Sequence, residues 1–457
     1  MSDGARFSAN RLKSPRLLTL LGAILISSIG IACIPVSMSG AVNGAPRWYS
    51  SSSPKGVAWT AVTCAPGSSD CVAAGFQSHL QVAAYSRNGG VTWARAALPK
   101  SSGSGLTEVQ SASCVVSSTK SVDCAVLAGF GNGCSLEAFY SINGGATWNR
   151  TGVPRLGGAN CDVLKVRCFA ATTGVDCVGN AGYVLYSDNG GRNWSQSSVA
   201  GSPVQGYDFS CSPFNGSVDC VVVDRCLGES GNVCDVGYYS TDGGLSWENS
   251  TGNVTQDPLV SVSCASATSG VDCTALGVDV SSGTATTIYS VDGGATWSAS
   301  SLQLSQVYGG GYEVSCGSLS SSVTCALVIN TGDSGGNFNG AESLYSSDGG
   351  ATWATGQFIS AFSAGWAVSG NWAPGNLQCQ PQAGALSCVF SDGFSEYSLN
   401  AGASWIRMSK PKGFEIGGYA VQGFDTSNCV TATQCVAVVA IGQGFSGKEG
   451  LSTTRAH

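Results

Sequence analysis

A nine-residue phrase occurs seven times along this chain. Its copies begin at residues 85, 140, 186, 239, 289, 345 and 397, and the copy at Tyr289–Trp297 reads YSVDGGATW. A spacing near fifty residues is typical of one supersecondary unit repeated in an array. The 457 residues also exceed what one hydrophobic core usually holds, roughly 250–300 residues. We therefore expect a repeat protein rather than a single layered domain.

Cysteines form a second repeat that keeps step with the first. Most of the 21 cysteines come in close pairs that bracket a short turn rich in Ser, Gly and Thr, as in VSCASATSGVDCTALG. This pattern predicts hairpins clamped by disulfides, whereas two histidines and no CxxC motif disfavour metal binding. Cys226 and Cys234 flank one loop, and Cys134 and Cys161 then pair by elimination. The predicted bridges are Cys64–Cys71, Cys114–Cys124, Cys134–Cys161, Cys168–Cys177, Cys211–Cys220, Cys226–Cys234, Cys264–Cys273, Cys316–Cys325, Cys379–Cys388 and Cys429–Cys435.

The two repeats together define a unit of four antiparallel strands. A strand runs to the first Cys, a second follows the other Cys, a third ends in Tyr-Ser, and a fourth follows the Trp of the phrase. Such units are the blades of a β-propeller, so we predict an all-β fold with a single propeller over 47–457. There are eight Cys pairs but seven phrases, and RWYSSSS near Trp48 supplies the missing outer strand. We expect eight four-stranded blades, closed by this N-terminal strand pairing with the C-terminal strands, with seven blades as the alternative.

The residue types within the phrase are those that a tight turn requires. A short polar side chain in its fourth position can accept backbone N–H groups within the turn, and glycine follows because the turn needs φ > 0. The polar residues are Asn88, Asn143, Asn189, Asp242, Asp292, Asp348 and Asn400. The seventh copy has Ala401 in place of the first glycine, so we predict strain there if φ stays positive. Asp70, Asp123, Asp176, Asp219 and Asp272, each before a second Cys, are interpreted as turn residues.

Through this repeated phrase the chain resembles the Asp-box, or bacterial neuraminidase repeat, superfamily. The motif S-x-D-G-G-x-T-W occurs in sialidases, xyloglucanases, sortilin-type receptors and photosystem II assembly factors. The resemblance implies a propeller and implies that the box is structural and lies away from the functional face. It does not imply chemistry. Arginines are sparse outside the N-terminal segment, which disfavours a sialidase, and one propeller alone disfavours a xyloglucanase-like cleft.

The N-terminus predicts a location outside the cytoplasm. Residues 1–16 are basic, residues 17–38 are apolar and residues 39–46 form a short linker. This arrangement is typical of a signal peptide or a transmembrane anchor, with the propeller exported. We expect a secreted or membrane-anchored protein, consistent with its disulfides. Membrane contact is expected through this segment alone, and a net charge of −7 disfavours nucleic acid as a partner.

Function is expected in the loops opposite the Asp-boxes, where sequence does not repeat. Aromatic side chains there could stack on a sugar or grip a protein loop, and the candidates are Trp366, Trp372, Tyr308 and Tyr312. Carboxylates that precede the first Cys could line a central channel: Glu108, Asp162, Asp208, Asp257, Glu313 and Asp425. Two of them could act as acid and base in a glycosidase, or several could hold Ca²⁺.

Our leading hypothesis is a monomeric, non-catalytic binding module for a protein or polysaccharide, with no cofactor and no catalytic residue. A glycoside hydrolase, sialidase-like or another exo-glycosidase, is the alternative, and a purely structural envelope protein is a third. The roles of the aromatic residues and of the candidate carboxylates separate these hypotheses. A specific carboxylate pair is needed by an enzyme alone, whereas a binding module can use the aromatic residues.

Overall fold

The computed structural model consists of β-strands, turns and loops, without an α-helix in the residues that it describes. None of the described segments is a helix long and apolar enough to cross a bilayer. The predicted N-terminal segments, over 1–46, and the loop that carries Trp366 and Trp372 lie outside the described residues. The structure describes residues 47–55, 57–77, 80–100, 107–130, 135–154, 164–172, 174–200, 202–223, 237–252, 257–279, 281–319, 322–332, 338–360, 376–382, 384–391, 395–407, 424–431, 434–439 and 450–455.

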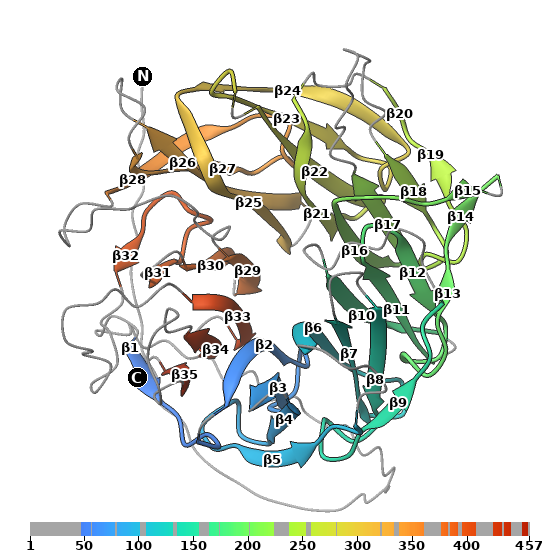
Figure 1. Cartoon of the computed structure of the whole chain (residues 1–457). Helices are drawn as coiled ribbons and strands as arrows, with labels where there is room; N and C mark the ends of the chain where they lie inside the picture. Colours follow the sequence, from blue (N-terminus) through green and yellow to red (C-terminus); the bar gives the residue numbers. More distant parts are fainter. Residues whose placement is uncertain are drawn as a thin grey trace, which may run out of the picture. The chain divides into compact units, whose positions relative to one another are not determined.

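Antiparallel sheets of four strands recur along residues 42–457, in the order predicted from the repeats (Figure 1). Sheet 1 consists of β2 (Ala58–Cys64), β3 (Cys71–Gln77), β4 (Leu80–Ser86) and β5 (Ala94–Ala97). Sheet 2 consists of β6 (Thr107–Val116), β7 (Val122–Phe130), β8 (Ser135–Ser141) and β9 (Asn149–Thr151). Sheet 3 consists of β10 (Lys165–Ala171), β11 (Gly174–Asn180), β12 (Val184–Ser187) and β13 (Ser195–Gln196). A small two-stranded sheet follows, formed by β14 (Ser198–Val199) and β15 (Ser202–Pro203).

The same order continues through the second half. Sheet 4 consists of β16 (Asp208–Phe214), β17 (Ser217–Val223), β18 (Tyr238–Ser240) and β19 (Glu248–Asn249). Sheet 5 consists of β21 (Leu259–Ser266), β22 (Val271–Asp279), β23 (Thr284–Ser290) and β24 (Thr296–Ser305), with β20 (Thr251–Gly252) parallel to β24 at its edge. Sheet 6 consists of β25 (Val307–Leu319), β26 (Ser322–Gly332), β27 (Phe338–Ser346) and β28 (Ala354–Ser360). Sheet 7 consists of β29 (Asn376–Gln382), β30 (Ala385–Ser391), β31 (Ser395–Ser398) and β32 (Ile406–Arg407).

The last sheet joins the two ends of the described chain. Sheet 8 has the order β1-β35-β34-β33, formed by β33 (Phe424–Thr431), β34 (Gln434–Val439), β35 (Gly450–Arg455) and β1 (Arg47–Ser50). Trp48 and Thr454 are partners in the antiparallel register of β1 and β35. The first strand of each sheet contacts the first strand of the next, and β33 contacts β2. These contacts are the ones that the predicted closure of a ring requires.

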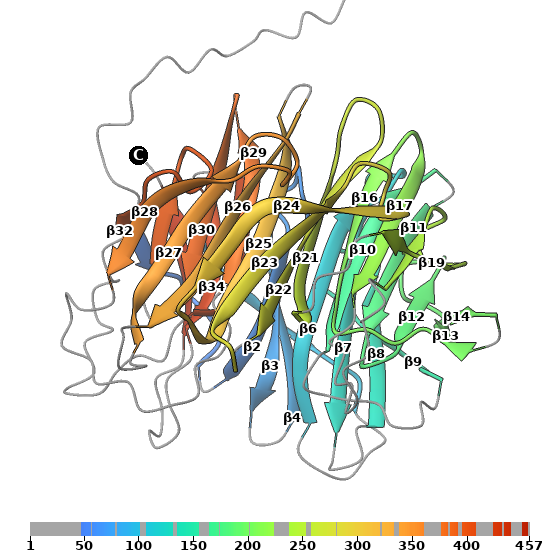
Figure 2. The ribbon, with the colours of Figure 1, turned by 90° about the horizontal axis from the view of Figure 1, so that it is seen from above.

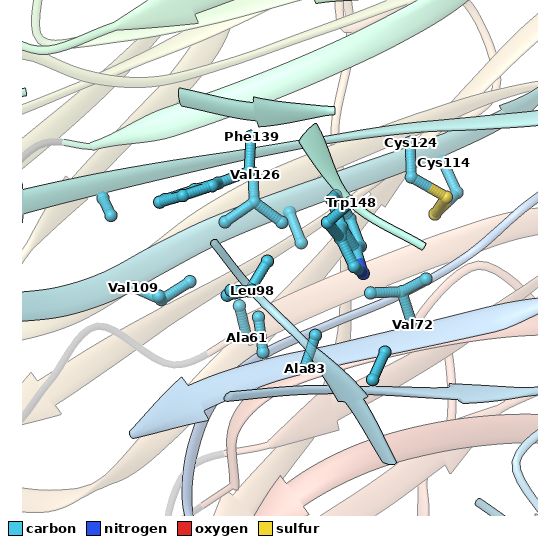
Figure 3. Packing of buried hydrophobic residues seen from close by; sticks show 14 of the residues in the cluster. Ala61, Val72, Ala83, Leu98, Val109, Cys114, Cys124, Val126, Phe139 and Trp148 are labelled. Carbon is cyan, nitrogen blue, oxygen red and sulfur yellow. A yellow bond between two sulfur atoms is a disulfide. The ribbon is translucent and has the colours of Figure 1, made fainter. Parts of the chain in front are cut away.

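Hydrophobic side chains fill the space between successive sheets. Figure 3 shows the cluster between sheets 1 and 2, where Val72 and Ala83 of one sheet face Phe139 and Trp148 of the other. The strands run between two opposite ends of the sheets (Figure 2), and the Cys-bracketed hairpins share one end with the Asp-boxes. The first strands begin at the other end of the sheets.

Seven of the predicted cysteine pairs are disulfides among the described side chains, with S–S distances from 2.02 to 2.10 Å. Each joins the first and second strands of one sheet at residues that are register partners. Cys429 and Cys435 are register partners in the backbone, but their side chains are outside the described set. The pairs Cys134–Cys161 and Cys226–Cys234 lie outside the described residues and stay predictions.

Candidate functional site

Seven Asp-box turns share one hydrogen-bond pattern. In the fifth copy, Asp292 Oδ1 accepts the N–H of Thr296 at 2.8 Å, and Ser290 Oγ accepts the N–H of Gly294 at 2.9 Å. The side chains of Thr296 and Ser290 also donate to the Asp292 carboxylate. Burial acts to raise the pKa of Asp292, but these hydrogen bonds outweigh it and lower the pKa. The carboxylate of Asp292 therefore forms its hydrogen bonds within its own turn, as the sequence predicted.

The Trp that ends the box also closes the turn. Trp297 Nε1 donates to the carbonyl of Gly294 at 2.9 Å, and the indole is buried against the neighbouring strands. The same bond occurs from Trp93, Trp247 and Trp353. Structural bonds therefore occupy the Asp-box end of these sheets.

Comparison with known proteins agrees with this geometry. The BNR/Asp-box repeat model matches residues 238–249, which contain the fourth box. The structure of the Dos1 propeller superposes with a TM-score of 0.53 at 10% identity, covering 89% of this chain and 93% of the other. The domain is a β-propeller, and it carries seven Asp-box turns. Its sheets are therefore called blades below, with the same numbers.

Further solved structures resemble the chain more weakly. YCF48 from Cyanidioschyzon merolae matches at 12% identity with a TM-score of 0.43, covering 90% of this chain and 98% of the other. The GH74 xyloglucanase from Xanthomonas campestris matches at 14% identity with a TM-score of 0.40, covering 90% and 68%. A sequence search among curated proteins found no significant match.

Polar side chains on the first strands tie blade 2 to 3, blade 4 to 5, blade 5 to 6 and blade 6 to 7 of the propeller. The side chain one residue before the first Cys accepts the N–H of the next blade's first Cys. Ser263 Oγ, for example, accepts the N–H of Cys316 at 2.9 Å. The side chain three residues before the first Cys accepts a second N–H, from the residue two positions before the next blade's first Cys. Ser261 Oγ, for example, accepts the N–H of Val314 at 3.3 Å. Equivalent bonds come from Ser111, Ser113, Ser210 and Ser315.

Four charged residues replace serine at these two positions. Lys165 and Arg167 occupy both positions in β10, while Asp208 in β16 and Glu313 in β25 occupy the earlier one. We call these four residues the inner charge cluster. Because β10, β16 and β25 belong to blades 3, 4 and 6, the cluster is assembled from distant parts of the sequence.

Asp208 is held tightly within the inner charge cluster. It is 4% exposed, forms an ion pair with Lys165 and accepts the N–H of Val262 at 3.0 Å. The Lys165 side chain remains 39% exposed, so its ammonium group faces both the carboxylate and water. The carboxylate therefore serves as a blade-to-blade tie of the kind that serine forms elsewhere.

Glu313 has the most perturbed environment in the cluster. Its carboxylate accepts the N–H of Leu377 from β29 at 2.7 Å. The carboxyl group of Glu313 is enclosed by protein, and only a small part of the residue's surface is accessible to solvent. This burial raises the pKa of Glu313 to about 7. Lys165, Arg167 and the Leu377 N–H act in the opposite direction, whereas the charge of Asp208 adds to the rise. Glu313 therefore changes its charge near neutral pH.

Of the remaining candidate carboxylates, only Asp257 has a described side chain. Asp257 is buried and accepts hydroxyl groups from Thr284 and Thr286 of β23, at 3.3 and 2.9 Å. Glu108 in β6 and Asp425 in β33 are placed only by their backbone, and Asp162 lies outside the described residues. No three His, Cys, Asp or Glu side chains in the described ranges come together as metal ligands. The Ca²⁺ alternative stays a prediction.

The candidate aromatic residues are only partly described. Tyr312 packs against a hydrophobic cluster of blades 5 and 6 that contains Val314 and Leu327, so it is largely a core residue. Tyr308 is placed in β25 by its backbone alone, and Trp366 and Trp372 fall outside the described residues. Sequence reasoning missed Lys165 and Arg167. Alignment of the repeats on the first Cys could have found them, because KVRC stands where SASC and SVSC occur in other blades.

Proposed function

We propose that this propeller is a non-catalytic binding module that acts outside the cytoplasm and takes a protein or carbohydrate ligand. The observation that carries the proposal is the state of the inner charge cluster. Asp208 and Glu313 both accept a backbone N–H from the next blade, so their first role is structural. The cations at the same end are less committed, because Lys165 is partly exposed. Cations that face water and carboxylates that face backbone suit binding better than bond cleavage.

The disulfides support the proposed location. Seven of them are formed among the described side chains, and bridges of this kind persist in oxidising compartments and are rare in the cytosol. Export through the N-terminal segment, with cleavage or anchoring, belongs to the same proposal.

One observation favours the glycosidase as a second candidate. A carboxyl group with a pKa of about 7, as in Glu313, suits a general acid, and Asp208 is the second carboxylate whose charge acts on it. For this candidate, Asp208 would have to release Val262 or Lys165 to reach a sugar. The geometry therefore supports it less well than binding.

A paired assay separates the two candidates. The purified propeller is screened on a glycan array and against immobilised extracellular proteins, and each bound glycan is then incubated with it and assayed for released reducing sugar. Binding without turnover supports the proposal. Turnover that is lost in both Glu313→Gln and Asp208→Asn, with unchanged melting temperature, would establish the hydrolase instead.

A further inference from the structure

We propose that Lys165 and Arg167 form a binding site for the carboxylate of an acidic, uronate-type carbohydrate. This inference rests on the proposed binding function and names its ligand class. Both residues stand on β10 two positions apart, and side chains at that spacing share one face of a strand. In blades 2, 4, 5 and 6 these positions are filled by six serines, Asp208 and Glu313, whose side chains tie one blade to the next. A cation cannot accept a backbone N–H, so blade 3 gives up this bond at both positions.

Arg167 is the central residue of the site. It is half-buried, and it forms no hydrogen bond or ion pair with any side chain that the structure describes. A guanidinium group presents several N–H donors in a planar fork that matches a carboxylate. Lys165 stands beside it with its ammonium group partly in water. A ligand carboxylate would add a direct partner for both cations, because Asp208 contacts Lys165 and Glu313 only lies in the field of Arg167.

The surroundings favour a sugar over an acidic peptide. The residues one position before the first Cys form a row across the blades, and each member with a described side chain is polar: Thr63, Ser113, Arg167, Ser210, Ser263, Ser315 and Gln378. Because the serine oxygens accept N–H groups, their own O–H groups remain available as donors. A row of hydroxyl and amide groups complements sugar hydroxyls, whereas a peptide usually brings apolar side chains that need an apolar surface.

Glu313 makes this site sensitive to pH. The four charges of the inner cluster sum to zero when Glu313 is ionised and to +1 when it is protonated. The charged groups that act on Glu313 are Lys165 and Arg167 of β10 and Asp208 of β16. Of the strands that pack against β25, β21, β26, β29 and β30 carry no Asp, Glu, His, Lys or Arg. The strand β22 also packs against β25 and carries Asp272 and Asp279, one near each of its ends, which are not among the charges that shift the pKa of Glu313. Affinity for an anion is therefore expected to rise as the pH falls through about 7.

The test is titration calorimetry of the full chain with oligogalacturonate, its methyl ester and hexaglutamate, at about pH 6 and about pH 8. We expect the wild type to bind oligogalacturonate about tenfold more tightly at the lower pH, because the cluster gains one positive charge. Arg167→Gln should weaken binding at least about tenfold, the usual effect of losing a charge-assisted bond. Glu313→Gln should bind tightly at both pH values. Arg95→Gln, a matched variant of an exposed arginine in β5, should bind like the wild type.

Each other outcome overturns the inference. Equal binding of the methyl ester, or equal binding by Arg167→Gln, would remove the carboxylate site. Binding of hexaglutamate without oligogalacturonate would assign the site to acidic peptides instead. If the array finds a ligand that Arg167→Gln still binds, the inference fails while the proposed function stands. If the propeller binds no glycan and no protein, both fail. Melting temperatures of all variants confirm that they are folded.

Discussion

Asp272 of blade 5 lies directly against Gly349, the first glycine of the Asp-box in blade 6. A β-carbon on Gly349 would come within 3.1 Å of Oδ2 of Asp272. The same relationship holds for the pairs Asp70–Gly144, Asp123–Gly190, Asp176–Gly243 and Asp219–Gly293. The aspartates before the second Cys are therefore more than turn residues, because each packs against the box of the following blade. Burial raises the pKa of Asp176, Asp219 and Asp272, as expected for carboxylates in this confined place.

The seventh box departs from this pairing in both of its members. The seventh box has Ala401 in place of glycine, and the preceding blade has Thr324 where five others have aspartate. The chain thus changes both members of the pair together, which suggests that aspartate and a β-carbon do not fit side by side.

This pairing can be tested by a double-mutant cycle. Gly349→Ala should destabilise the propeller by about 2 kcal/mol, since the residue has φ +70° and the methyl group would crowd Asp272. Adding Asp272→Thr, which copies the pair in the seventh blade, should recover about 0.5–1 kcal/mol as a coupling energy. Chemical denaturation of the four proteins measures the cycle. Strict additivity would show that the two residues do not sense each other.

Ala401 offers the reverse experiment. Its φ is 58°, so the predicted positive φ is present, and the left-handed conformation costs an alanine about 1 kcal/mol or more. Ala401→Gly removes that strain but also a buried methyl group, so we expect a net gain of only about 0.5 kcal/mol. The matched control is Ala403→Gly, whose φ is not positive and which should lower the melting temperature. A fall in both variants would contradict the strain at Ala401.

Glu313 should make the stability of the propeller depend on pH. Its pKa is raised from 4.5 to about 7 on folding, so between these values the native state binds more protons than the unfolded chain. Stability is then highest on the acid side and falls as the pH rises through this window, by at most about 3 kcal/mol. In Glu313→Gln this fall should disappear, whereas it should persist in Glu248→Gln, which changes an exposed carboxylate. Melting temperatures between about pH 4.5 and pH 8 give the slope, and identical slopes in wild type and Glu313→Gln would refute the assignment.

The pairing of β1 with β35 predicts a large effect of a small truncation. Deleting Gly450–Arg455 with the following two residues removes the strand between β1 and β34, and both edges lose their partners. We expect a lower melting temperature and increased aggregation, because unpaired strand edges associate. Deleting only Ala456–His457 is the control and should leave the melting temperature unchanged. An equally stable protein after both deletions would argue against ring closure through β1.

Most of the fold could be predicted from local patterns in the sequence. The all-β class, the four-stranded unit and the Asp-box turns follow from residues close together in the chain, such as Cys264 with Cys273 and Ser290 with Asp292. Strand alternation and turn chemistry act over a few residues, so their signals survive in a single sequence. The contact between the two ends was predictable only because the repeats could be counted.

Relationships between blades were decided by the tertiary structure. Asp208 and Glu313 are about one hundred residues apart, and no local signal says that both act with Lys165 and Arg167. Their grouping depends on the register in which one inner strand meets the next, and on how far charges reach across the centre of a folded domain. The sequence determined the repeating unit because that unit is held by short-range bonds. The charge cluster required the fold, because packing of many units brings its members together.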